Sequence, residues 1–143
     1  MEIFVGPDEY KLSDDESDTI ITLGIGSCIV GIFYDPFDRI GGMIHVTNPV
    51  RGKEGILALI KAMEALGAKK TFIQAKIIGG AHLLNANMAA GKKNIEFIKQ
   101  ILEEENIRIV FEDTGLNHAR NVKFFIKDGK ALVKRVKKHA RRN

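Results

Sequence analysis

The sequence predicts a single-domain α/β protein with layered mixed/antiparallel sheets and two main amphipathic helices. Apolar runs of strand length recur between turn-forming residues along the chain. Two other segments carry apolar residues at helical spacing. The chain has 143 residues, 45% of them hydrophobic, and a chain of this size buries about two-thirds of its unfolded surface. We therefore expect one domain with a substantial core.

The first predicted elements are short. Ile3–Val5 is expected to be a strand that Gly6-Pro7 ends. Ser13–Asp18 is typical of a solvated acidic loop, and it leads into a strand predicted over Thr19–Leu23. The spacing of its carboxylates lacks the pattern of a calcium-binding loop, so no metal site is predicted there.

The segment around the only cysteine predicts a β-hairpin. Apolar runs at Cys28–Tyr34 and Ile40–Val46 flank the turn-forming residues Asp35–Arg39. Immediately upstream, Gly24–Ser27 is too rich in glycine to extend a strand comfortably. We expect the chain to turn there and to present backbone N–H groups beside the sulfur.

Two registers of this hairpin are considered. If Phe33 pairs with Ile40, Cys28 lies directly opposite His45; if Tyr34 pairs with Ile40, the offset is one residue. Directly opposed residues have Cβ atoms only ~4.5–5.5 Å apart. Both registers therefore place the thiol and the imidazole at the same end of the hairpin.

The rest of the chain is predicted to mix helices and strands. Helices are expected over Glu54–Leu66, with Gly67 as C-cap, and from the N-cap Asn94 to Glu105. Strands are expected over Thr71–Ile78, Ile107–Glu112, Asn121–Ile126 and Ala131–Val136, with a turn at Asp128-Gly129.

A histidine beside a cysteine is typical of nucleophilic catalysis. The thiolate is the nucleophile, and a neighbouring imidazole can lower the thiol pKa below its free value of ~8.5. Backbone donors at Gly26 and Ser27 are candidates for an oxyanion hole next to Cys28. Thr22, on the preceding strand, is the candidate hydrogen-bonding partner for the imidazole of His45.

The same residues also fit structural roles. A lone cysteine in an apolar strand is commonly a small buried hydrophobe, and a strand histidine is commonly a satisfied core or surface residue. Joint placement at one hairpin end favours a catalytic pair, but the residue types alone leave both interpretations open. The remaining histidines have no zinc-binding spacing, and the glycines match no nucleotide-binding motif. No metal or organic cofactor is predicted.

Positive charge gathers at the C-terminus. Residues 134–143 (KRVKKHARRN) carry six Lys/Arg and no acid, in a chain of formal net charge +4. We expect a domain at residues 1–133 followed by a basic, solvated tail. The tail has no Phe, Tyr or Trp on which bases could stack, which argues against nucleic-acid binding.

The hydropathy pattern and the cysteine content also predict where in the cell the protein is located. The chain has no apolar run of ~20 residues, and its first residues lack the basic and apolar regions of a signal peptide. We therefore expect no membrane insertion. A single cysteine argues against a disulfide scaffold, so a reducing, cytoplasmic location is expected.

Two motifs resemble the signature of the chemoreceptor glutamine deamidase family CheD. These are TLGIGSC at Thr22–Cys28 and MIHV at Met43–Val46. Further blocks resemble the family in the same order, at Gly79–Ala81, at Gly91–Asn94, and at Glu112–Gly115 with Arg120. The resemblance covers nearly the whole chain and identifies residues 1–133 as a CheD-like glutamine deamidase domain.

The resemblance implies a role for each motif residue. Cys28 matches the family's nucleophile, His45 its general base, and Thr22 the residue that completes the triad. The family converts selected glutamine side chains of chemoreceptors to glutamate with release of ammonia. The implied substrate is thus the helical cytoplasmic domain of a chemoreceptor. A CheC-type phosphatase that binds over the same site is the implied partner.

The chain departs from the family pattern in two places. The connection Val46–Glu54, between His45 and the first long helix, is shorter than is usual in the family. Leu116 stands where a second glycine is common. These departures leave an alternative of a different class: a chemotaxis adaptor that binds receptors or the phosphatase with weak or no catalysis.

Overall fold

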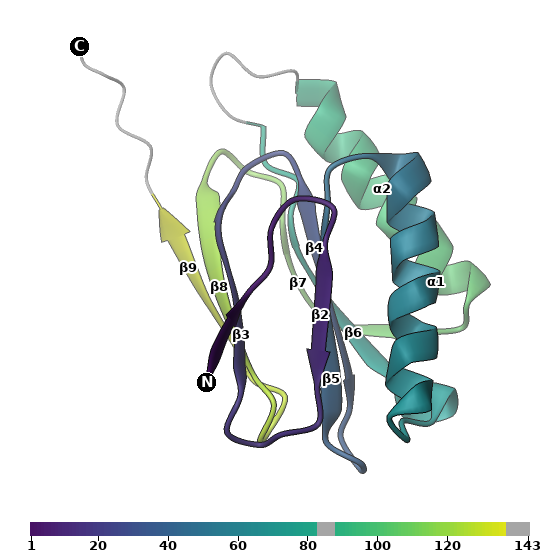
Figure 1. The fold of residues 1–143 in the computed structure, drawn as a ribbon. Helices are drawn as coiled ribbons and strands as arrows, with labels where there is room; N and C mark the ends of the chain where they lie inside the picture. The colour runs from purple at the N-terminus through teal and green to yellow at the C-terminus, as the bar shows by residue number, and fades with distance from the viewer. Residues whose placement is uncertain (83–87, 137–143) are drawn as a thin grey trace.

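The computed structural model describes residues 1–82 and 88–136 and arranges them in three layers (Figure 1). In chain order its elements are β1 (Glu2–Phe4), β2 (Tyr10–Ser13), β3 (Thr19–Ile25), β4 (Ile29–Asp35), β5 (Ile40–Val46), α1 (Pro49–Ala65), the 3-10 turn η1 (Lys70–Phe72), β6 (Gln74–Gly79), α2 (Met88–Glu104), β7 (Arg108–Thr114), β8 (Ala119–Phe125) and β9 (Ala131–Val136).

Two sheets and a helical layer make up the domain. One sheet has the strand order β2-β5-β4-β6-β7, and the other has the order β1-β3-β8-β9. Figure 1 shows α1 and α2 on one side of the five-stranded sheet, with β3, β8 and β9 on its other side. The predicted fold class, layered mixed sheets with two main helices in one α/β domain, is confirmed.

The central strand β4 separates two hydrophobic cores, and all of its residues are buried. Ile29 and Phe33 belong to the core beneath the helices, whereas Val30 and Ile32 belong to the core between the sheets. This alternation follows from the two-residue period of a strand. Cys28, two residues before Val30, is half-buried and also packs against the core between the sheets.

The β4–β5 hairpin is present as predicted, but in a different register. Asp35 pairs with Ile40, and Val30 therefore lies opposite His45. Both registers predicted for Ile40 are wrong. Cys28, in the bend just before β4, is consequently not directly across from His45. It precedes Val30, the residue opposite His45, by two positions and packs on the same side of the sheet.

The side chain of Asp35 explains why the loop between β4 and β5 is shorter than the predicted Asp35–Arg39. Its carboxylate accepts hydrogen bonds from the backbone N–H groups of Phe37 at 2.9 Å and Asp38 at 3.1 Å, which closes the turn. It also accepts from the N–H of Lys69 at 3.0 Å. Because these bonds satisfy a fully buried carboxylate, Asp35 can serve as the last residue of β4 instead of the first residue of a loop.

The first long helix starts earlier than predicted. It begins at Pro49, not at Glu54, because Asn48 caps it: the Asn48 side-chain oxygen accepts from the N–H of Val50 at 2.9 Å. Proline suits the first turn, where its missing N–H costs nothing. Gly67 follows the helix with a φ of +114° and ends it as predicted.

The second long helix also begins earlier, at Met88 and not at Asn94. Asn94 lies inside the helix, and its side-chain Nδ2 donates to the carbonyl of Ser27 at 2.9 Å. A tertiary contact therefore replaces the predicted capping role. The predicted apolar stripe is confirmed, since Ile98 and Leu102 are both fully buried.

Strand existence was easier to predict than strand bounds. Ile40–Val46 and Ala131–Val136 match their predicted ranges. The strand expected from Thr71 starts instead at Gln74, after the 3-10 turn η1. β2 was not predicted, because its sequence YKLS mixes polar and apolar residues and it pairs only with β5 at the edge of the sheet.

The predicted boundary after residue 133 falls inside β9. Lys134 pairs with Asn121 of β8, and the guanidinium of Arg135 lies 2.9 Å from the carboxylate of Asp113 on β7. The domain therefore continues to Val136, and the rest of the predicted tail, residues 137–143, lies outside the described residues. Across residues 1–82 and 88–136, no helix is long and apolar enough to cross a membrane.

Replacement of Leu59 by alanine tests the core beneath α1. Leu59 is fully buried, and its truncation is expected to lower the free energy of unfolding by about 2–5 kcal/mol. Val50 of the same helix is 74% exposed, so Val50→Ala is the matched control with an expected change within about 0.5 kcal/mol. Urea unfolding followed by circular dichroism measures both. Equal effects of the two substitutions would contradict this packing.

Candidate active site

Cys28 lies in a bend between β3 and β4 that is pinned by the end of β6 and the residues after it. The carbonyl of Cys28 accepts from the N–H of Gly80 at 2.8 Å, and the carbonyl of Gly26 accepts from the N–H of Ala81 at 3.0 Å. A Cβ on Gly79, which has a φ of +115°, would lie only 2.3 Å from the Cys28 carbonyl oxygen. Only glycine permits so close an approach.

Helix α2 reaches the same bend. Besides the bond from Asn94 to the Ser27 carbonyl, Gly91 allows the helix to approach closely, since a Cβ there would lie 2.4 Å from the carbonyl oxygen of Gly80. All three carbonyls of the bend thus accept hydrogen bonds from the protein. Within residues 1–82 and 88–136, the N–H groups of Gly26 and Ser27 meet no acceptor.

His45 lies near the end of β5 and is only 8% exposed. Its cross-strand partner Val30 faces the core between the sheets, so the imidazole faces the same layer. Neither ring nitrogen has a hydrogen-bond partner among the residues that the structure describes. A buried imidazole with two unsatisfied nitrogens is unusual and calls for a functional explanation.

The register brings Cys28 and His45 to the same face and the same end of the five-stranded sheet. Cys28 precedes Val30 by two residues, and Val30 lies opposite His45, so the two residues are diagonal neighbours. Such neighbours are ~7–8 Å apart along the sheet, with somewhat shorter Cβ distances. This placement puts the thiol and the imidazole in the same layer, between the two sheets.

Thr22 lies on β3, in the other sheet, and is 2% exposed. Its hydroxyl donates a hydrogen bond to the carbonyl of Val5 at 3.0 Å. The predicted hydrogen bond between Thr22 and the imidazole of His45 is not formed in this structure, because both ring nitrogens lack partners among the described residues. The observed role of the hydroxyl is to tie β3 to the segment after β1.

Burial controls the charge of the two candidate reactive groups. Burial raises the pKa of the Cys28 thiol above its ordinary value and lowers the pKa of the His45 imidazole below its ordinary value. The sequence favours the opposite change, a thiol pKa lowered through an ion pair with histidine, and the structure differs because burial dominates. The structure instead favours a neutral thiol beside a neutral imidazole at pH 7.

Asp8 is the charged residue that acts on both groups. Its negative charge raises the pKa of Cys28 and of His45, in each case as a smaller effect than burial. The carboxylate is held by the backbone N–H of Thr47 at 3.0 Å and by the Thr47 hydroxyl, and these bonds lower its own pKa. Its backbone N–H donates to the carbonyl of His45 at 2.8 Å.

Sequence reasoning missed Asp8 and the contact made by Asn94. Asp8 follows Gly6-Pro7 in a segment that the sequence predicts as an ordinary loop, and in the folded structure this loop lies against the end of β5. Its left-handed φ of +57° is a conformation that aspartate tolerates better than most residues, but the sequence offers no further signal.

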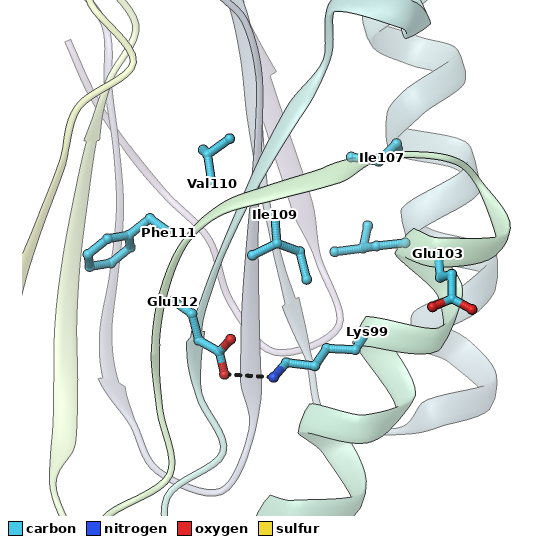
Figure 2. Close-up of a pocket in the computed structure, with 8 residues that line it drawn as sticks. Lys99, Glu103, Ile107, Ile109, Val110, Phe111 and Glu112 are labelled. Carbon is cyan, nitrogen blue, oxygen red and sulfur yellow. Dashed lines mark ion pairs between the residues drawn. The ribbon is translucent and has the colours of Figure 1, made fainter.

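A groove of ≈ 630 Å³ lies elsewhere, between α2 and β7 (Figure 2). Among the residues that the structure describes, its lining contains no cysteine, histidine or serine, and its Lys99 amine lies 3.0 Å from the carboxylate of Glu112. It therefore has no evident nucleophile. Among residues 1–82 and 88–136, no group of three or more His, Cys, Asp or Glu is arranged to hold a metal ion.

Solved structures with similar folds support the three-layer architecture. A Bacillus licheniformis hypothetical protein, YfiH, matches with a TM-score of 0.54 and 16% identity over 76% of this chain and 51% of that protein. A Neisseria meningitidis protein of the DUF152 family matches with a TM-score of 0.51 and 14% identity over 87% of this chain and 62% of that protein. At these identities the similarity shows the fold alone.

Closer similarity comes from sequence. Residues 45–135 match the family model described as CheD chemotactic sensory transduction. The chemoreceptor glutamine deamidase CheD of Thermotoga maritima is 35% identical over 95% of this chain and 93% of the relative. A probable chemoreceptor glutamine deamidase CheD of Archaeoglobus fulgidus is 37% identical over 93% of this chain and 92% of the relative. The family model spans more than half of the chain and these relatives cover nearly all of it, so this protein belongs to the CheD family.

Proposed function

We propose that this protein is a protein-glutamine deamidase that converts glutamine side chains of chemoreceptors to glutamate and releases ammonia. Membership of the CheD family and the names of its relatives support the reaction and the substrate. The observation that carries the proposal is the position of Cys28 in a pinned bend, on the same face as a buried His45 whose ring nitrogens have no partner in the described structure.

Because the imidazole of His45 is neutral in the resting enzyme, it can accept a proton and act as the general base. On substrate binding, a ring nitrogen of His45 takes the thiol proton while Sγ of Cys28 attacks the carbon of the glutamine side-chain amide. The carbonyl oxygen becomes an oxyanion. Because the carbonyls of the bend are engaged with the protein, its N–H groups, such as those of Gly26 and Ser27, are the donors available to stabilise that charge.

Collapse of the tetrahedral intermediate completes the first half of the reaction. The imidazolium of His45 donates its proton to the leaving amine, the carbon–nitrogen bond breaks, and ammonia leaves a thioester on Cys28. The imidazole then takes a proton from water, the hydroxide attacks the thioester, and the thiolate leaves and is reprotonated. The products are glutamate and free enzyme, and none of these proposed steps uses a metal or an organic cofactor.

We assign Thr22 the role of orienting the imidazole during turnover. Its hydroxyl proton is directed to the Val5 carbonyl, which leaves the lone pairs of the oxygen to accept from another donor. A rotated or protonated His45 supplies such a donor. The bond to Val5 thus predisposes Thr22 to act as an acceptor, which is the chemistry that the third member of a triad needs.

The proposed deamidase function also implies the partners and the location of the protein. The substrate is the helical cytoplasmic domain of a chemoreceptor, and the reaction takes place in the cytoplasm. A CheC-type phosphatase would compete with the receptor if it covered the bend that holds Cys28. We do not assign membrane insertion or nucleic-acid binding to this chain.

Loss of the thiol tests the proposed function. Cys28→Ala should abolish receptor deamidation, and His45→Gln should slow it by about 10²–10⁴-fold, because the general base is lost. Each variant is co-expressed with a chemoreceptor cytoplasmic fragment, and deamidated glutamines are located by mass spectrometry of peptides. Unchanged deamidation by Cys28→Ala would contradict the proposal. If wild type and Cys28→Ala both bind the fragment and neither modifies it, the adaptor alternative is favoured.

Asp8→Asn tests the electrostatics of the pair. The asparagine keeps an oxygen that can accept from Thr47 but removes the negative charge that raises the pKa of both Cys28 and His45. Both pKa values should fall, so the pH profile of kcat/KM for deamidation should move to lower pH as a whole. Glu16→Gln is the matched control, because Glu16 pairs with Arg39 at the opposite end of the β4–β5 hairpin. A lower rate with an unmoved profile would refute the assignment.

A further inference from the structure

The four-stranded sheet leaves one of its faces uncovered within residues 1–82 and 88–136. Its other face packs against the five-stranded sheet, where Ile20, Val122 and Phe124 are fully buried. Successive side chains of a strand point to opposite faces, so the neighbours of these residues point away from the core. Figure 1 shows β3, β8 and β9 as the outermost layer on the side away from the helices. We call the outward side of β1, β3, β8 and β9 the outer face.

The strand register places four residues in one row across the outer face. Phe4 of β1 pairs with Ile21 of β3, which pairs with Lys123 of β8. Lys123 in turn pairs with Leu132 of β9. Neighbouring strands lie about 4.8 Å apart, so the row spans roughly 14 Å. Ile21 is only 2% exposed, whereas Phe4 and Leu132 are 56% and 59% exposed. The row is therefore an apolar strip with a buried centre, two open ends and one lysine.

Two more apolar side chains extend this strip. Leu23 follows Ile21 by two residues on β3, and Val136 follows Leu132 by four residues on β9, so each points to the same side as its predecessor. Leu23 is 56% exposed and Val136 is 37% exposed. Large apolar side chains gathered on an uncovered sheet face are typical of a surface that contacts a partner or a membrane.

The charge of the outer face is positive. Its four strands carry four basic residues and one acidic residue, Glu2. Two of the basic residues are arginines that contact Asp113 of β7. The other two, Lys123 and Lys134, lie on the outer face, and neither forms an ion pair with any residue that the structure describes. Residues 137–143, which directly follow β9 in the sequence, add four Lys/Arg and no acid.

We propose that the outer face binds the surface of a bilayer that contains anionic phospholipids. Phenylalanine and leucine side chains enter the boundary between headgroups and acyl chains, while lysines attract the anionic headgroups. A planar bilayer can contact the whole strip at once without a complementary cavity. Such binding is peripheral and needs no segment that crosses the membrane. It goes beyond the proposed function and does not depend on it, because Cys28 packs on the opposite side of this sheet, against the core between the sheets.

Vesicle binding tests the role of charge. The full chain should bind vesicles of phosphatidylcholine and phosphatidylglycerol but not of phosphatidylcholine alone, and salt should weaken the binding because it screens the charges. Lys123→Gln combined with Lys134→Gln should lower the partition coefficient about ten-fold or more, since each lysine near an anionic surface contributes about five-fold. Lys61→Gln combined with Lys92→Gln is the matched control. It removes the same charge from exposed positions on α1 and α2, and binding should stay within about two-fold of wild type.

A tryptophan reporter tests the apolar contact. The chain contains no tryptophan, so the emission of Leu132→Trp reports that position alone. With the anionic vesicles its emission maximum should move to shorter wavelength, and brominated phospholipids should quench it. Val50→Trp is the control, because Val50 is 74% exposed on α1, in the helical layer. Its emission should change in neither way.

Three results would overturn the inference. Wild type that does not bind the anionic vesicles would leave an acidic protein surface as the alternative occupant of the outer face. Unchanged binding in the Lys123→Gln/Lys134→Gln variant would assign any binding to other charges, such as those of residues 137–143. Equal quenching of Leu132→Trp and Val50→Trp would show adsorption without a preferred face.

Discussion

The close approach between the end of β6 and the Cys28 bend is the constraint on which the site depends. A Cβ at Gly79 would lie only 2.3 Å from the carbonyl oxygen of Cys28, and a Cβ at Gly91 only 2.4 Å from the carbonyl oxygen of Gly80. Three separate parts of the chain, the bend, the end of β6 and helix α2, can meet only because both positions are glycine. Their meeting engages the carbonyls of the bend, whereas the N–H groups of Gly26 and Ser27 meet no acceptor among residues 1–82 and 88–136.

Burial then determines the protonation states of the two candidate reactive groups, the Cys28 thiol and the His45 imidazole. A thiol and an imidazole between two packed sheets both favour their neutral forms, and the charge of Asp8 alters this balance without reversing it. A neutral pair needs substrate to trigger proton transfer, whereas a standing thiolate would react with any electrophile. Under the proposed function, the reactivity of Cys28 would therefore be coupled to binding of the substrate.

Local sequence predicted most of the elements, though not β2, and tertiary contacts decided their details. The apolar patterns predicted both helices and the hairpin, and the glycines marked the bend. The register could not be read from the sequence because the buried carboxylate of Asp35 closes the turn from within β4. Asn94 resembles a helix cap, yet its side chain holds the Ser27 carbonyl. The contribution of Asp8 depends on a loop that only the assembled fold brings to β5.

The most direct measurement of the central claim is the pH dependence of Cys28 alkylation by iodoacetamide in the free enzyme. The chain has one cysteine, so the total rate reports that side chain alone. A neutral resting pair predicts slow alkylation at pH 7 and a rise governed by a pKa above the ~8.5 of a free cysteine. Rapid alkylation that is already constant below pH 7 would show a standing thiolate–imidazolium ion pair and would contradict the account.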